Sequence, residues 1–87
     1  MISDATALKR IAFHVNRLLD ASGMSRYRLA KITDESEQTI KSVADGAHVP
    51  RASLLARIAE AFGVKVDELL QPIPASKKSG KKLQEIL

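Results

Sequence analysis

Two short helical patterns separated by only three residues constrain the fold of this chain more than any other feature. The first pattern covers residues 25–32 and turns Leu29 and Ala30 inward. The second covers residues 36–45, so residues 33–35 are the whole connection. Two short helices with so tight a connection must cross at a steep angle. The sequence therefore predicts a compact pair of crossed helices that the rest of the chain supports.

The second helix of this pair has a narrow apolar side and a broad polar side. On a helical wheel, Ser36, Val43 and Ala44 lie within about 60° of Ile40, which marks the apolar side. The polar outer positions lie about 100° or more from Ile40 and are Gln38, Lys41, Ser42 and Asp45. The apolar side of such a helix can pack against a core while its polar side remains available to solvent or to a ligand.

Apolar residues at helical spacing predict three further helices: from near Ser3 or Asp4 to about Ala21, from 51 to 62, and from 66 to 70. The fold class predicted is therefore all-α, a compact five-helix bundle. The expected inward positions of the first and fourth helices are Leu8, Ile11, Ala12, Val15, Leu18, Leu19, Leu55, Ile58, Ala59 and Phe62. The expected wet side of the first helix carries Lys9, Arg10, Phe13, Asn16, Arg17 and Asp20.

Polar and glycine residues mark the ends of the two crossed helices. Ser25 is placed to cap the first of them. For the second, Ser36 and Asp34 are alternative N-caps, and Glu37 would complete a capping box with Asp34. Gly46 follows the second helix and predicts its end.

Composition limits the class of protein. The chain of 87 residues is long enough for one domain. It has no Cys, which excludes disulfides, thiolate chemistry and Cys-type zinc sites and fits a reducing compartment. No apolar run approaches the roughly 18 residues of a membrane span, and the N-terminus lacks the charged-then-apolar order of a signal peptide. We therefore expect a soluble, cytoplasmic protein.

The positive charge of the chain is concentrated near its C-terminus. The formal net charge is +4, but residues 1–71 carry ten Lys and Arg against nine Asp and Glu, a net +1. From Pro72 onward there are four Lys against Glu85, a net +3. Any affinity of residues 1–71 for nucleic acid must therefore come from the placement of their charges, because their total charge contributes little.

Several short motifs together resemble the helix-turn-helix domains of the phage repressor and Cro type, an XRE-like family. They are Leu29-Ala30, Thr39-Ile40, Asp45-Gly46, Pro50 and the run LLARIAEAFGVKVDELL. The resemblance covers roughly residues 8 to 70. It implies a lambda-repressor-like domain of five helices whose third helix enters the major groove of double-stranded DNA, usually as a homodimer on a palindromic operator.

The turn between the crossed helices departs from the family. Asp34 stands where a Gly is usual, and Glu35 stands where an apolar core residue is usual. Asp tolerates a left-handed backbone better than most residues, so we expect the turn to survive. Burial of an unpaired carboxylate is costly, so Glu35 must point outward or find a basic partner.

The outer side of the third helix supplies the expected base contacts. The amide of Gln38 can pair with N6 and N7 of adenine, and Lys41 can reach guanine or phosphate. Glu37 is either a first-turn acid favoured by the helix dipole or a reader of cytosine, and Ser42 completes the face.

In relatives, the start of the helix over residues 25–32 and the loop after the third helix approach the DNA backbone, so phosphate contacts are expected there. The candidates are Arg26, Lys31, Ser36, Thr39, His48 and Arg51. The alternative for Arg26 and His48 is that each is a solvated surface side chain with no contact to DNA. Tyr27 is predicted either to join the core or to lay its ring against Lys31 one turn later.

Three apolar residues are candidates for contact with a second chain. In many relatives the surface around the fifth helix pairs two subunits, so the resemblance implies Val66 and Leu70. Phe13 is either half covered by a neighbouring long side chain or by the tail, or in contact with another chain. The predicted domain covers residues 1–71, and residues 72–87 form a predicted basic flexible tail with a possible short helix over 81–87. Seven residues alone cannot hold a helix in water, so the alternatives are a disordered tail, lysine contacts to phosphate, or docking on a subunit or protein partner.

Two functions are compatible with these features. The first is a sequence-specific DNA-binding regulator that acts as a repressor. The second is an antitoxin-like protein-interaction module with secondary DNA binding, suggested by the acidic turn and the near-neutral domain. The sequence offers no nucleophile-base pair, metal cluster or Gly-rich phosphate loop, so we expect no enzyme, no metal and no cofactor.

Overall fold

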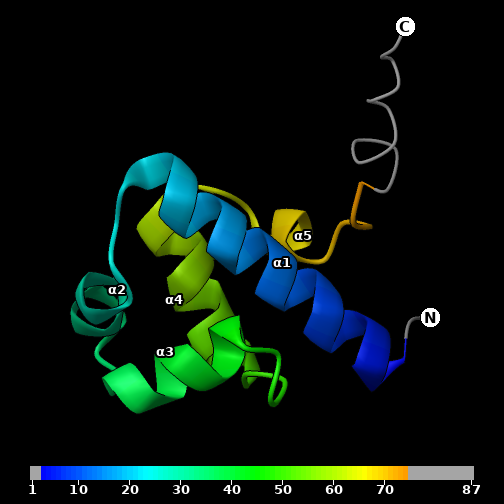
Figure 1. Ribbon diagram of the computed structural model, residues 1–87, viewed down its shortest axis with the longest axis horizontal. Coiled ribbons are helices and arrows are strands. Elements are labelled where there is room, and N and C mark those ends of the chain that lie inside the picture. Colours follow the sequence, from blue (N-terminus) through cyan, green and yellow to red (C-terminus); the bar gives the residue numbers. More distant parts are fainter. Residues whose placement is uncertain (1–2, 75–87) are drawn as a thin grey trace, which may run out of the picture.

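The computed structural model describes residues 3–74, which form five α-helices (Figure 1). This confirms the all-α prediction. The predicted helix over 81–87 and all but the first residues of the predicted tail lie outside the described residues. The helices are α1 (Asp4–Ser22), α2 (Arg26–Thr33), α3 (Glu37–Ala44), α4 (Ala52–Phe62) and α5 (Val66–Leu69).

The helices pack so that α3 lies at an edge of the molecule. α2 packs on α3 and α4, α1 packs on α3 and α5, and α4 packs on α5. In Figure 1, α2 lies at the left and α3 at the bottom, α4 lies in the centre, and α1 crosses the molecule diagonally and passes beside α5. The crossed pair predicted from the short connection is therefore α2 and α3, held from behind by α1 and α4.

The core is aliphatic and draws on all five helices. Two of its residues, Leu54 and Leu69, were not among the predicted inward positions, whereas the predicted Leu55 and Phe62 are only half-buried. Adjacent leucines differ by about 100° on a helix, so packing against α2 and α5 decides which of them faces inward. The core residues are Ile11, Val15, Leu19, Leu29, Ala30, Ile40, Val43, Ala44, Leu54, Ile58, Ala59 and Leu69.

Serine caps begin the first three helices. The hydroxyls of Ser3, Ser25 and Ser36 each accept a hydrogen bond from the backbone N–H three residues later. The alternative that Asp34 caps α3 is wrong, because Asp34 ends α2 in the left-handed region with φ 61°. Asp34 is the one non-glycine residue with positive φ in the described part of the chain, so the predicted tolerance of the turn is confirmed.

Polar side chains predicted on the wet side of α1 instead join it to its neighbours. The side-chain amide of Asn16 donates to the backbone oxygen of Ala44 at 2.8 Å, at the end of α3. Arg10 donates to the backbone oxygen of Leu70 at 3.1 Å, just after α5. Both contacts satisfy carbonyls that a helix end leaves without an intrahelical partner.

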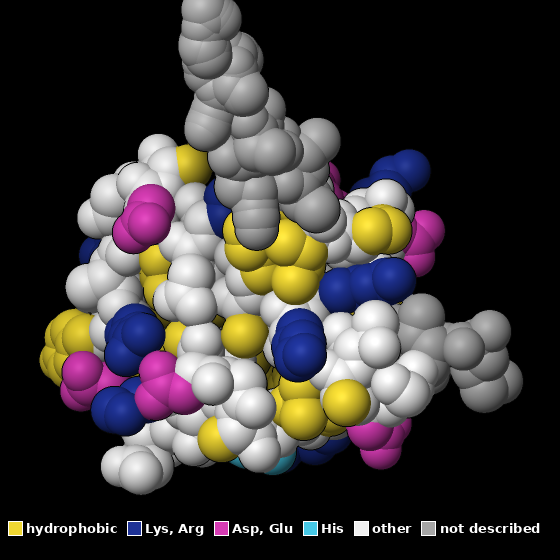
Figure 2. Space-filling model, turned by 45° about the vertical axis from the view of Figure 1, so that its right-hand side comes forward, with side chains coloured by type: hydrophobic (Ala, Val, Ile, Leu, Met, Phe, Trp, Pro, Cys, Tyr) yellow, Lys and Arg dark blue, Asp and Glu magenta, His cyan; other side chains and the backbone are white. Residues whose placement is uncertain are grey.

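Surface charges of both signs are interspersed. In the face that Figure 2 shows, Lys and Arg side chains lie among Asp and Glu side chains and form no continuous basic area. No helix within residues 3–74 combines the length and the apolar character that a membrane crossing requires.

Candidate nucleic-acid interface

Helix α3 has the two-sided character that the sequence predicts. On its inner side Ile40 and Val43 are at most 1% exposed, and α3 packs on both α1 and α2. On its outer side Glu37, Gln38 and Lys41 are exposed, and Ser42 is half-buried. Nothing in the described part of the chain covers the outer side of Gln38 and Lys41, so a ligand can reach it.

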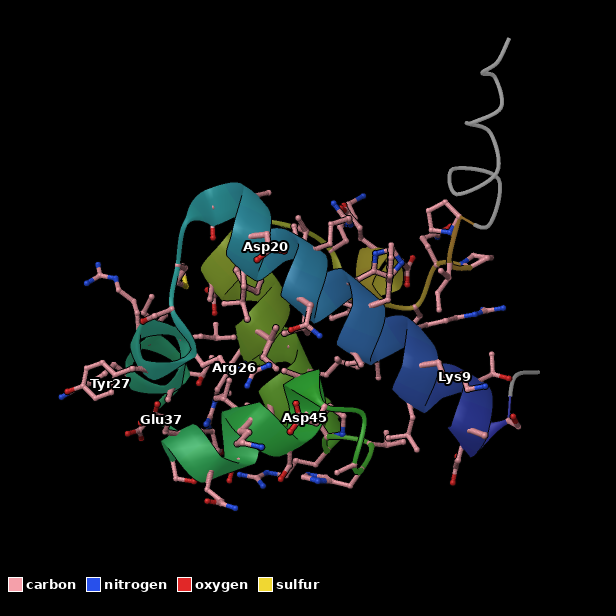
Figure 3. All side chains as sticks on the ribbon, in the orientation of Figure 1. Lys9, Asp20, Arg26, Tyr27, Glu37 and Asp45 are labelled. Carbon is pink, nitrogen blue, oxygen red and sulfur yellow. The ribbon has the colours of Figure 1, made fainter. Side chains whose placement is uncertain are left out.

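An open hollow lies between the start of α2 and the outer side of α3. It has a volume of about 310 Å³ and is lined by Arg26, Glu37, Gln38 and Lys41. One predicted phosphate contact and three predicted base contacts are thus brought together, although Arg26 belongs to a different helix from the others. Figure 3 shows Arg26 between the ribbons of α2 and α3, and Glu37 at the start of α3.

Asp45 pairs with the two cations that face this side of α3. Its Oδ2 lies 2.8 Å from Nζ of Lys41, and its Oδ1 lies 3.6 Å from a guanidinium nitrogen of Arg26. The hydrogen bond from Lys41, together with the charges of Lys41 and Arg26, lowers the pKa of Asp45 below its ordinary value of 3.8, against a smaller opposing effect of desolvation. Asp45 is therefore ionised at neutral pH and offsets part of the positive charge beside it.

Glu35 finds basic partners, one of the two outcomes that the sequence allowed. Its side chain is only 13% exposed, and its Oε2 lies 2.8 Å from Arg51 and 3.9 Å from Arg57. Arg57 also donates to the backbone oxygen of Thr33 at 3.2 Å, at the end of α2. The turn is thus tied to the start of α4, and the guanidinium of Arg51, a predicted phosphate contact, rests against a carboxylate.

The remaining predicted phosphate contacts are accessible to different degrees. Ser36 and Thr39 share a hydroxyl hydrogen bond of 2.9 Å, and the backbone N–H of Thr39 donates to Ser36. Nζ of Lys31 lies 5.3 Å from the ring centroid of Tyr27, which confirms the stacking alternative for that ring and excludes the core one. His48 is exposed in the loop after α3.

The candidates for contact with a second chain are half-buried within this one. The ring of Phe13 meets the buried ring of His14 edge-on, at a centroid distance of 5.0 Å. Val66 and Leu70 pack against the core from α5. Each residue therefore leaves only part of its surface for a subunit contact.

Two members of this interface were missed by sequence reasoning. The ion pairs of Asp45 were not predicted, although a Lys and an Asp four positions apart on a helix indicate such a pair. Arg57 was not predicted at all, because its partner Glu35 is far from it in the sequence and no local pattern joins them.

Comparison with known proteins agrees with this geometry. A family model for the Cro/C1-type HTH DNA-binding domain matches residues 14–75, from the middle of α1 to beyond α5. No curated protein and no solved structure matches the chain significantly.

Proposed function

The chain belongs to the Cro/C1-type helix-turn-helix DNA-binding family, and on that premise we propose that it is a sequence-specific transcriptional repressor that binds a palindromic operator as a homodimer. The observation that carries this proposal is the outer side of α3, which is exposed, polar and set on a buried apolar side. A major groove about 12 Å wide admits one α-helix, and base edges there present donors and acceptors that such side chains can read.

Four residues of α3 are the proposed base contacts. Gln38 would pair with N6 and N7 of adenine, and Lys41 would donate to O6 or N7 of guanine. Glu37 would accept from N4 of cytosine, and Ser42 would contact an adjacent base edge. The exposure of Gln38, Lys41 and Glu37 supports this assignment, whereas Ser42 has less free surface.

The proposed phosphate contacts surround these base contacts, and the tail lysines would add to them. Arg26 lines the same hollow as Gln38 and Lys41, so it would meet the backbone next to the bases that they read. Ser36 and Thr39 lie at the start of α3, where backbone N–H groups favour an anion. The full proposed set is Arg26, Lys31, Ser36, Thr39, His48 and Arg51.

In the proposed homodimer, two copies of α3 would enter successive major grooves about 34 Å apart. The proposed subunit contacts are Phe13, Val66 and Leu70. We propose the DNA-binding domain at residues 1–71 and a basic tail at 72–87 that adds phosphate contacts or binds a protein partner. A regulator of this kind would act in the compartment that holds the DNA.

Selection of bound fragments from random duplex DNA, with the full chain as bait, tests this function. A dimer should recover two inverted half-sites whose centres are about 10 base pairs apart. A single recovered half-site would contradict the dimer, and recovery of random fragments would contradict sequence-specific binding.

A second function, an antitoxin-like interaction module with secondary DNA binding, is favoured by one observation. Residues 1–71 carry a net charge of only +1, and four of their cations at or near the proposed interface already face carboxylates. Salt dependence separates the two functions. The logarithm of the binding constant should fall with the logarithm of salt by about 0.9 per phosphate neutralised, and a flat response would favour the interaction module.

A further inference from the structure

Asp45 holds two cations from different helices with its two carboxylate oxygens. One oxygen faces Lys41 of α3 and the other faces Arg26 of α2. We propose that Asp45 is a positioning residue that orients Arg26 and Lys41 for the operator and weakens the binding of other DNA. This inference rests on the function proposed above.

The three charges are accessible to DNA. The side chains of Arg26, Lys41 and Asp45 are 39%, 59% and 42% exposed, so a phosphate can approach all of them. Two positive charges and one negative charge leave a net +1 where the cations alone would give +2. Because Asp45 stays ionised, this reduction persists at neutral pH.

A comparison with Glu35 shows why Asp45 is more than a structural ion pair. The side chain of Glu35 is only 13% exposed and ties the turn to α4, so this carboxylate is part of the packing, whereas the side chain of Asp45 is 42% exposed. The side-chain contacts of Asp45 in the described part of the chain are with Arg26 and Lys41, both on the proposed DNA-facing side. The orientation of these two cations therefore depends on Asp45 more than the fold does.

The two kinds of DNA complex should respond differently to this carboxylate. Binding to non-operator DNA depends mainly on cations that meet phosphates, so a carboxylate between two such cations opposes it. Binding to the operator also depends on base contacts, and an ammonium group already held in one direction loses less conformational freedom when it makes them. The carboxylate of Asp45 should therefore weaken binding to non-operator DNA more than it weakens binding to the operator.

The variant Asp45→Asn tests the inference because it removes the charge and keeps the shape. Affinity of the full chain is measured by fluorescence anisotropy for the selected operator and for a duplex of equal length without it, over a series of salt concentrations. We expect the variant to bind the non-operator duplex about threefold more tightly. This is the effect of removing the repulsion between one carboxylate and one phosphate about 7 Å apart at the dielectric constant of water. The salt slope should steepen by about 0.9, and the ratio of operator to non-operator affinity should fall.

The matched control is Asp20→Asn, which makes the same change in net charge. Asp20 is exposed near the end of α1, away from α3 in the view of Figure 3, and forms no ion pair among residues 3–74. Equal effects of the two variants would overturn the inference, because net charge alone would then explain them.

A second variant tests whether the effect of Asp45→Asn passes through Arg26 and Lys41. The triple change Asp45→Asn, Arg26→Gln and Lys41→Gln should return the salt slope to the wild-type value or below, since no freed cation is left. An unchanged affinity ratio in Asp45→Asn, with normal operator binding by the wild type, would overturn this inference and leave the proposed function standing. Failure of the wild-type chain to bind any duplex would overturn both.

Discussion

The carboxylate of Glu35 lies 2.8 Å from the guanidinium of Arg51, although the two residues are 16 positions apart. Glu35 occupies a position where the family usually has an apolar core residue, and it is still largely covered, with 13% of its side chain exposed. Its partners Arg51 and Arg57 keep 66% and 47% of their own side chains in solvent. The carboxylate is thus mostly covered, while the two guanidinium groups keep about half or more of their side-chain surface in solvent.

This arrangement predicts that Glu35→Gln and Glu35→Leu have different effects on stability. Glu35→Gln keeps a polar group in a mostly covered site and weakens its charged hydrogen bonds, so the free energy of unfolding should fall by about 1 kcal/mol. Glu35→Leu restores an apolar residue and leaves the arginines solvated, so it should be neutral or stabilising. Urea denaturation measures both, with the exposed Glu60→Gln as a control; a loss of several kcal/mol in Glu35→Leu would show that the ion pairs hold the turn.

The link between Asn16 and Ala44 predicts a second effect on stability. Asn16→Ala removes the donor at 2.8 Å from a carbonyl at the end of α3, where Ala44 is 4% exposed. An unsatisfied carbonyl in such a place costs about 1 to 3 kcal/mol of unfolding free energy. Thermal and urea unfolding test this, and Lys9→Ala on the exposed side of α1 should stay within about 0.5 kcal/mol of the wild type.

The lowered pKa of Asp45 predicts how the free energy of unfolding changes with pH. Its pKa is lower in the folded chain than its ordinary value of 3.8, so the folded state favours the ionised form. The stability that this gives is present above about pH 4 and is lost as the pH falls through the lowered pKa. The difference in unfolding free energy between the wild type and Asp45→Asn should therefore shrink below pH 4, and an NMR titration should place the midpoint of Asp45 below 3.8. A midpoint above that value would contradict the ion pairs with Lys41 and Arg26.

Lys41 and Arg26 predict two different patterns of lost DNA affinity. If Lys41 reads a guanine, Lys41→Ala should weaken operator binding and relax the preference at one base pair by about 1 to 3 kcal/mol. Arg26→Ala removes a phosphate contact, so affinity should fall evenly across operator variants and the salt slope should decrease by about 0.9. Binding to a panel of single-base operator variants measures both. An even loss in Lys41→Ala would assign that residue to phosphate instead.

The sequence by itself determined most of what lies within one turn of helix. Periodicity, serine caps and stop residues gave five helices with ends close to those observed, and the left-handed turn at Asp34 followed from the tolerance of Asp for that backbone. The buried side of α3 at Ile40, Val43 and Ala44 was also predicted correctly, whereas Ser36, predicted on that side, is an exposed N-cap. These features depend on residues three or four positions apart, which the sequence places directly.

The tertiary structure decided which residues meet across helices. It selected Leu54 over Leu55 for the core, turned Asn16 toward the end of α3, and placed Arg57 against Glu35. It also brought Arg26 of α2 to Asp45 at the end of α3 and so set the charge of the proposed DNA-facing side. Periodicity fixes the direction of a side chain relative to its own helix, whereas its partner depends on how whole helices pack, and that packing is settled by all the contacts of the core together.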